Sequence, residues 1–162
     1  MLKGSRNPIK AVKFLLLASI LMSCEKNIVH EQLIKIDEAT WNLEKEVQLN
    51  WIVDDTINSF DIYIVLQHNE RYPYRNLFLF TQIINDYNFQ TMDTLAVFLA
   101  KANGEWTGKG SGALINHRLP YLVDYRFERL GDYQLMLRHG MRDDDLVGIE
   151  NIGILIKKHL VE

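Results

Sequence analysis

The chain has 162 residues, of which 48% are hydrophobic and 24% are charged, a composition typical of one folded domain and not of a disordered segment. Its formal net charge is −3, but the first 23 residues hold four basic side chains and no acidic one, so the rest of the chain carries about −7. An acidic body lacks the clustered lysine and arginine side chains that bind phosphate. This argues against nucleic-acid binding and against tight binding of an anionic membrane by the folded domain itself.

The amino terminus has the order of a secretory signal peptide. A basic segment precedes the apolar run Phe14–Ser23, and Cys24, the only cysteine in the chain, follows directly. The run is too short to cross a bilayer, which requires roughly 20 apolar residues. The sequence Leu-Met-Ser-Cys at residues 21–24 resembles a bacterial lipobox. We therefore expect residues 1–23 to be a lipoprotein signal peptide, and Cys24 to become the acylated first residue of the mature chain.

Two other interpretations of Cys24 are an incidental cysteine in an ordinary secreted protein and a buried structural thiol. Neither explains why the single cysteine lies at the junction. A chain without any other cysteine also suits an oxidising compartment, where a spare thiol would form unwanted pairs. Each buried methylene contributes about 0.8 kcal/mol, so two or more acyl chains anchor stably. We expect lipid attachment at Cys24, a tether over residues 24–32 and one domain over residues 33–162.

From about Leu33 onward, apolar residues recur at every second position, which is the period of half-buried strands. Val123 is expected to share a buried face with its neighbours in one such strand. The richer runs 76–84 and 94–100 predict strands that are buried on both faces, and residues 80–98 are typical of a hairpin. Helix should be scarce. The alternating segments are 47–53, 60–66, 119–127, 133–137 and 152–156.

About eight strands spaced by turn signals, in a domain of roughly 130 residues, favour an all-β fold. Two packed antiparallel sheets would bury one face of each strand and leave the other face in water. We predict an antiparallel β-sandwich, either jelly-roll-like or immunoglobulin-like.

A search for catalytic and metal-binding patterns is largely negative. The five histidines never occur at metal-ligand spacing, and the segment Arg142–Gly148 has three consecutive carboxylates where a Ca²⁺ loop would alternate them. The glycine-rich segment Asn103–Gly112 lacks the spacing of a phosphate-binding loop, and its glycines are better explained by turns. We therefore expect no enzyme, no metal ion and no cofactor.

Aromatic residues provide the best candidates for contact with a ligand or a partner. Tyr72, Tyr74 and Trp106 lie in polar segments, and exposed aromatic rings can stack on sugars or contact a protein partner. The structural alternative is that these rings fill the rim and the core of the sandwich. Pro73 predicts the start of a loop here.

Three segments carry a resemblance to a known family: YPYRNLFLF (72–80), DTLAVFLAKANGEWTGKGSG (93–112) and HGMRDDDLVGIENIGILI (139–156). In this order, and together with the lipobox, they resemble the gliding motility lipoprotein GldH family of Bacteroidetes. Residues Ala100–Gly104 depart from the family pattern in charge but keep its turn. The resemblance implies a cell-envelope lipoprotein, expected in the outer membrane, that accompanies the gliding machinery and type IX secretion. It implies no catalytic residues.

Two functional hypotheses follow. In the first, acyl chains hold a non-enzymatic scaffold at the membrane, where the sandwich binds other gliding or envelope proteins. In the alternative, the same anchor carries a carbohydrate-binding module that binds glycan through Tyr72, Tyr74 and Trp106. A hydrolase ranks third, and it would require a polar cleft with two facing carboxylates.

Overall fold

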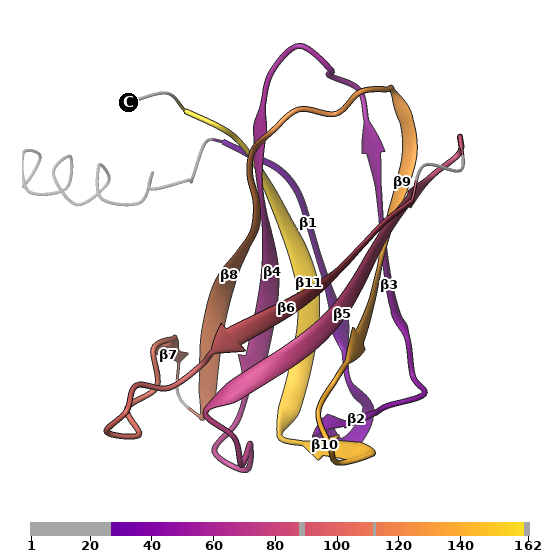
Figure 1. Cartoon of the computed structure of the whole chain (residues 1–162). Coiled ribbons are helices and arrows are strands. Elements are labelled where there is room, and N and C mark those ends of the chain that lie inside the picture. The colour runs from indigo at the N-terminus through magenta and orange to yellow at the C-terminus, as the bar shows by residue number, and fades with distance from the viewer. Residues whose placement is uncertain (1–26, 88–89, 112, 161–162) are drawn as a thin grey trace, which may run out of the picture.

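Two antiparallel sheets pack face to face in the computed structural model, which describes residues 27–87, 90–111 and 113–160 (Figure 1). Cys24 and the predicted signal peptide lie outside the described residues. The first sheet has the order β1-β11-β4-β8-β7, the second has the order β3-β9-β5-β6, and β2 and β10 form a small ribbon. The predicted β-sandwich is confirmed. The strands are β1 (Ile28–Lys35), β2 (Thr40–Asn42), β3 (Val47–Val53), β4 (Phe60–His68), β5 (Asn76–Asn85), β6 (Gln90–Phe98), β7 (Lys109–Ser111), β8 (Leu114–Tyr125), β9 (Gly131–His139), β10 (Asp145–Val147) and β11 (Ile149–Lys158).

Helix is scarce, as the missing helical period predicted. The one helical segment of the described residues is a single 3-10 turn, η2 (Asp37–Ala39). In this part of the chain, no helix has the length and apolar character needed to cross a membrane.

The core lies between the two sheets and follows the predicted alternation. In β3 every second residue is buried, and Leu49 pairs in register with Leu135 of β9, so both side chains point inward. From the first sheet, Ile64 of β4 and Ile154 of β11 are also paired and fully buried. Burial of one such side chain contributes roughly 1.5–3 kcal/mol, and the two inward faces together supply most of the stabilisation.

The described residues contain eleven strands, where the alternation predicted about eight. The three additional strands, β2, β7 and β10, have three residues each, which is too short to show a period. The expected boundary between tether and domain at residues 32 and 33 is wrong, because β1 begins at Ile28 and pairs with β11 along its length. β1 is an edge strand with several polar residues that are partly or fully exposed, so its sequence shows little alternation of apolar and polar residues.

The hairpin of β5 and β6 is confirmed, but the prediction that both strands are buried on both faces is wrong. β5 alternates strictly, so Leu79 points into the core while Phe80 is 47% exposed. In β6, Met92 is 75% exposed and Phe98 is 74% exposed. The second sheet therefore presents apolar side chains to solvent on its outer face. A run of apolar residues in the sequence does not show which of their side chains are buried by packing and which remain exposed to water.

The prediction that Val123 shares a buried face in β8 is also wrong, since its side chain is 59% exposed. The register of β8 against β4 shifts twice between Phe60 and Tyr63. Next to Val123, Asp124 adopts a φ of 53°. These irregularities turn Val123 outward, whereas Phe127 after the strand packs against the core.

We expect Gly153→Ala to lower the free energy of unfolding by about 2 kcal/mol or more, because the added methyl group would overlap the backbone carbonyl oxygen of Gln32 in β1. The matched control is Gly110→Ala in β7, where a Cβ atom meets nothing within 4 Å. Urea unfolding should leave the control close to the wild type. Equal midpoints for the two variants would show that β1 and β11 can separate freely.

Candidate functional site

The three predicted contact residues lie together near one end of the sandwich, but they do not form an exposed platform. The ring of Tyr72 lies 6.0 Å from the ring of Tyr74 and 6.4 Å from that of Trp106, between centroids. Tyr72 is only 3% exposed, and its hydroxyl group donates a hydrogen bond to the carbonyl oxygen of Asn76 at 2.8 Å. The expectation of three exposed rings is thus wrong for Tyr72, which belongs to the core.

Trp106 covers a buried pair of histidines. Its ring centroid lies 4.4 Å from that of His68, and Nε2 of His68 lies 3.0 Å from Nε2 of His117. Nδ1 of His68 lies 3.0 Å from the carbonyl oxygen of Asn69, which can only accept, so this nitrogen carries the proton. Nε2 of His68 must then accept a hydrogen bond from the Nε2–H group of His117. The pair forms a chain of hydrogen bonds between neutral rings.

Burial sets the charge state of this pair. The pKa of His68 is lowered by burial, and that of His117 is lowered to about 4 by burial and, to a smaller extent, by the neighbouring His68. Gly108 allows the close packing, because a Cβ atom there would lie 2.8 Å from Nε2 of His117. The two rings are therefore neutral structural groups at neutral pH.

The spacing of the histidines in the sequence, which was interpreted only for metal binding, did not predict this pair. A signal was present, since continuing the alternation of residues 60–66 by one step places His68 on the buried face. Its partner His117 comes from β8 and pairs in register with Leu66, a contact that no local pattern shows.

The carboxylates of the segment Arg142–Gly148 contact neighbouring side chains. Asp143 accepts a hydrogen bond from the hydroxyl group of Tyr74, and Asp145 accepts one from the amide of Asn42 at 2.7 Å. Within residues 27–87, 90–111 and 113–160, no group of three or more His, Cys, Asp or Glu side chains could hold a metal ion. The first contact joins the segment before β10 to the loop between β4 and β5, and the second joins β2 to β10 within the ribbon.

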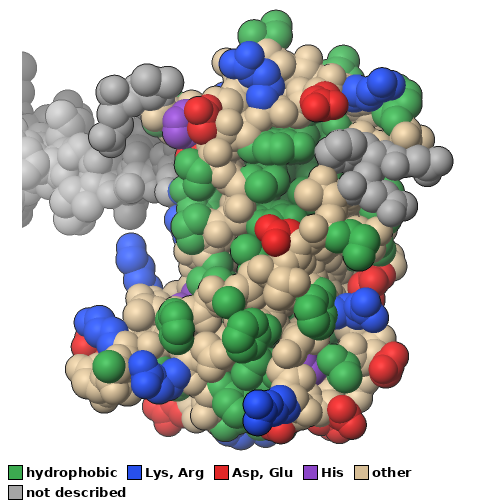
Figure 2. All heavy atoms as spheres, viewed as in Figure 1, with side chains coloured by type: hydrophobic (Ala, Val, Ile, Leu, Met, Phe, Trp, Pro, Cys, Tyr) green, Lys and Arg blue, Asp and Glu red, His purple; other side chains and the backbone are tan. Residues whose placement is uncertain are grey.

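Four exposed apolar side chains of the second sheet lie on the outer side of its hairpin. We define the outer β5–β6 face by the side chains of Phe78, Phe80, Met92 and Phe98, which are 40%, 47%, 75% and 74% exposed. Figure 2 shows several hydrophobic side chains on the face formed by these strands, with polar side chains and backbone between them. Next to Phe80 and Met92 lies a groove of about 330 Å³, which is also lined by Met136 of β9. This face was not predicted, because the apolar runs of both strands indicated burial on both sides.

Comparison with known proteins gives one family. A family model described as "GldH lipoprotein" matches residues 28–156. The chain is 30% identical to the "Gliding motility lipoprotein GldH homolog" of Christiangramia forsetii, over 90% of this chain and 93% of that protein. It is 29% identical to the "Gliding motility lipoprotein GldH" of Flavobacterium johnsoniae, over 93% of this chain and 98% of that protein.

Among solved structures, the chain is similar to the VP2 subviral particle of infectious bursal disease virus and to the Gx strain of that virus. The TM-scores are 0.36 and 0.33, with sequence identities of 14% and 15%. In both cases 84% of this chain is covered, and it spans about a third of the viral chain.

The histidine pair predicts a loss of stability in acid. Both rings are neutral in the fold, so between the ordinary pKa of 6.5 and about 4 the unfolded chain binds more protons than the folded one. The free energy of unfolding should fall as the pH is lowered through this window, by about 3 kcal/mol for His117 alone. In His117→Gln, whose amide can still donate to His68, this share should disappear. Urea unfolding at pH 7 and pH 4.5 measures it, and an unchanged acid loss in the variant would contradict the assignment.

Proposed function

Because the chain belongs to the GldH lipoprotein family, we propose that it is a lipid-anchored, non-enzymatic protein of the cell envelope that serves the gliding motility machinery. The two relatives are named for gliding motility and for their lipoprotein character. To this we add three proposals for the present chain: an accessory or scaffold role, a link to type IX secretion and a location in the outer membrane.

We place the anchor at Cys24. The residue directly follows an apolar run of signal-peptide length, and the first described residue of the domain, Asn27, comes only three positions later. An acylated Cys24 would therefore hold the sandwich close to the membrane. Two or more acyl chains are sufficient for stable attachment.

The scaffold role rests on one observation, the outer β5–β6 face. Soluble monomers seldom leave a contiguous apolar patch in water, and phenylalanine and methionine are enriched in the centres of protein interfaces. Methionine side chains adapt to different surfaces, which suits Met92 and Met136 in the groove. β6 is also the last strand of its sheet, so its free edge could pair with a strand of a partner. We expect a gliding or envelope protein with an apolar segment to bind here.

The buried pair of His68 and His117 supports a non-enzymatic role. His68 and His117 are 0% and 4% exposed, and each uses its Nε2 atom in the hydrogen bond to the other ring, so these nitrogen atoms already have a partner within the protein. The alternative, a carbohydrate-binding module, would rest on Tyr74 and Trp106 alone once Tyr72 is buried, and no specific observation favours it.

Cys24→Ser should abolish acylation and release the protein from the membrane fraction, because the hydroxyl group cannot replace the thiol in lipid attachment. Mass spectrometry of the protein from its own cells measures both the removal of the leader and the added acyl mass. The control is Ser23→Ala, which keeps a small residue before the cysteine and should be acylated normally. A wild-type protein with a free Cys24 thiol or a retained leader would contradict the anchor.

The double variant Met92→Ser/Phe98→Ser should lose its protein partners while it remains folded, because both side chains are about three-quarters exposed. We expect crosslinking in intact cells, followed by affinity purification of the acylated protein, to recover gliding proteins about tenfold less efficiently than with the wild type. Ile52→Ser is the matched control, since Ile52 is 72% exposed on the outer side of the same sheet but at the opposite edge. Equal recovery from both variants would reject this face as the binding surface.

A further inference from the structure

The chain enters the domain at one defined end of the sandwich, which we call the tether end. The backbone N–H of Lys158 donates to the carbonyl oxygen of Asn27 at 2.9 Å, and that of His159 donates to the carbonyl oxygen of Ser59 at 2.9 Å. These bonds bring together the start of β1, the end of β11 and the loop between β3 and β4. The loop between β8 and β9 lies at the same end (Figure 1).

Chain length limits the distance of this end from a membrane. Cys24 and Asn27 are three residues apart, and three fully extended residues span at most about 11 Å. If Cys24 carries the acyl chains, as proposed above, the tether end cannot leave the layer of lipid headgroups by more than this distance. The ten residues of β11 extend roughly 33 Å, so the rings of Tyr72, Tyr74 and Trp106, near its far end, lie at about that distance from the tether end.

Apolar side chains project from the two loops of the tether end. Ile57, between β3 and β4, is 82% exposed, and Leu130, between β8 and β9, is 54% exposed. Leu160, just after β11, is 61% exposed. None of these three side chains belongs to the core. On a domain free in solution, each would be an isolated apolar side chain in water. Because all three lie at the tether end, the membrane beside the tether is a surface that all three can contact.

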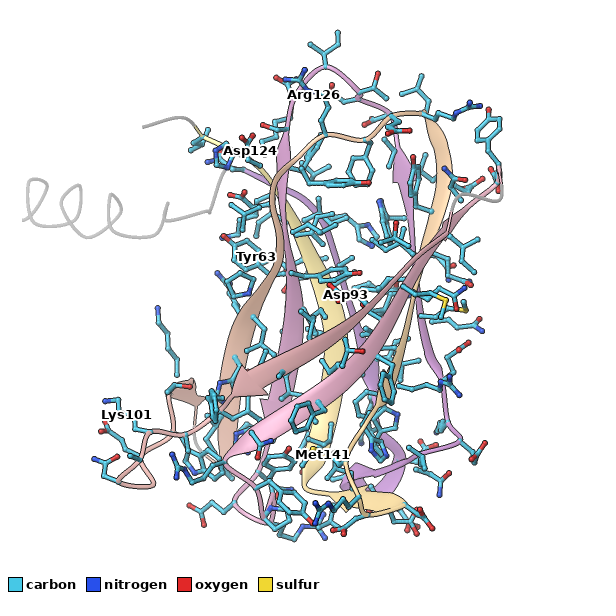
Figure 3. All side chains as sticks on the ribbon, viewed as in Figure 1. Tyr63, Asp93, Lys101, Asp124, Arg126 and Met141 are labelled. Carbon is cyan, nitrogen blue, oxygen red and sulfur yellow. The ribbon has the colours of Figure 1, made fainter. Side chains whose placement is uncertain are left out.

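The side chains around them suit a membrane interface. Figure 3 shows Arg126 at the top of the molecule, in the loop that also carries Leu130. The guanidinium group of Arg129 lies 4.7 Å from the ring centroid of Tyr87, so an arginine and an amphipathic aromatic ring stand together. Arginine and tyrosine side chains can reach the headgroup layer while their apolar parts contact the acyl boundary.

Charge attraction is not the driving force. Asp54 and Glu128 are exposed in the same two loops, and Asp55 lies 3.8 Å from the amino group of Lys158. The acids offset the arginines, so the surface has no excess of positive charge to attract anionic lipids. Contact must come from burial of the aliphatic side chains. A few such side chains bind weakly by themselves, but a short tether raises the effective concentration of the lipid surface and makes weak contact sufficient.

We propose that the tether end of the sandwich docks on the bilayer surface, with Ile57 and Leu130 inserted at the interface and the strands directed away from the membrane. This inference rests on the proposed acylation of Cys24. It goes beyond that proposal because an acylated protein with a freely rotating domain would be anchored equally well.

The test uses the full acylated protein reconstituted in neutral phosphatidylcholine vesicles. Since the chain has one cysteine, whose thiol is blocked by the lipid, a cysteine introduced by Ile57→Cys or Leu130→Cys is the only thiol that a fluorophore can label. Quenching by the neutral solute acrylamide reports exposure to water. We expect both labels to be quenched severalfold less than a label at Phe98→Cys, the control on the outer β5–β6 face. Adding Leu130→Ser to the Ile57→Cys protein should raise quenching at position 57.

The outcomes separate this inference from the proposed function. Equal quenching at positions 57 and 98 in a protein whose mass shows acylated Cys24 would overturn the docking and leave the anchor intact. An unmodified Cys24 would overturn both, and it would be recognised by a second labelled thiol. Protection that appears only when anionic lipid is added would also contradict docking through apolar contact.

Discussion

The pairing of β1 with β11 is the interaction on which the arrangement of the molecule depends. It joins the beginning and the end of the domain in one antiparallel ladder, which pairs Ile28 with Lys157, shifts register once before His30, and then continues to Lys35 opposite Asn151. Gly153 allows the two backbones to approach closely, and β4 holds the other side of β11. Because β1 is held along its whole length, the position at which the tether leaves the domain is fixed relative to both sheets.

Much of the fold could be predicted because apolar and polar residues alternate wherever one face of a strand is buried and the other is exposed to water. The pattern in β3, β4 and β9 gave the strands, their inward residues and the class of fold. It failed for β5 and β6, because an apolar side chain in the sequence carries no sign of whether another surface covers it. It also failed for Val123, because a local shift of register reverses which side chains face the core.

The candidate site was predictable in its residue types and not in its geometry. Tyr72, Tyr74 and Trp106 do come together, but Tyr72 is covered by the packing that also contains His68 and His117. The two histidines are 49 positions apart, and only the register of β4 against β8 makes them neighbours. The prediction of lipid attachment at Cys24 rests on a different kind of signal, the order of charged and apolar residues, which requires no knowledge of the fold.

The direction in which β1 leaves the sheet has a mechanical consequence. A lipid anchor before Asn27 would pull β1 along its own axis, and the opposing load from a bound partner would reach it through β11. Hydrogen bonds in a ladder loaded this way are sheared together, whereas a strand peeled from its end would lose them one by one. If Cys24 carries the proposed anchor, tension between the membrane and a bound partner loads the ladder of β1 and β11 in shear, and β1 does not peel away from its first residue.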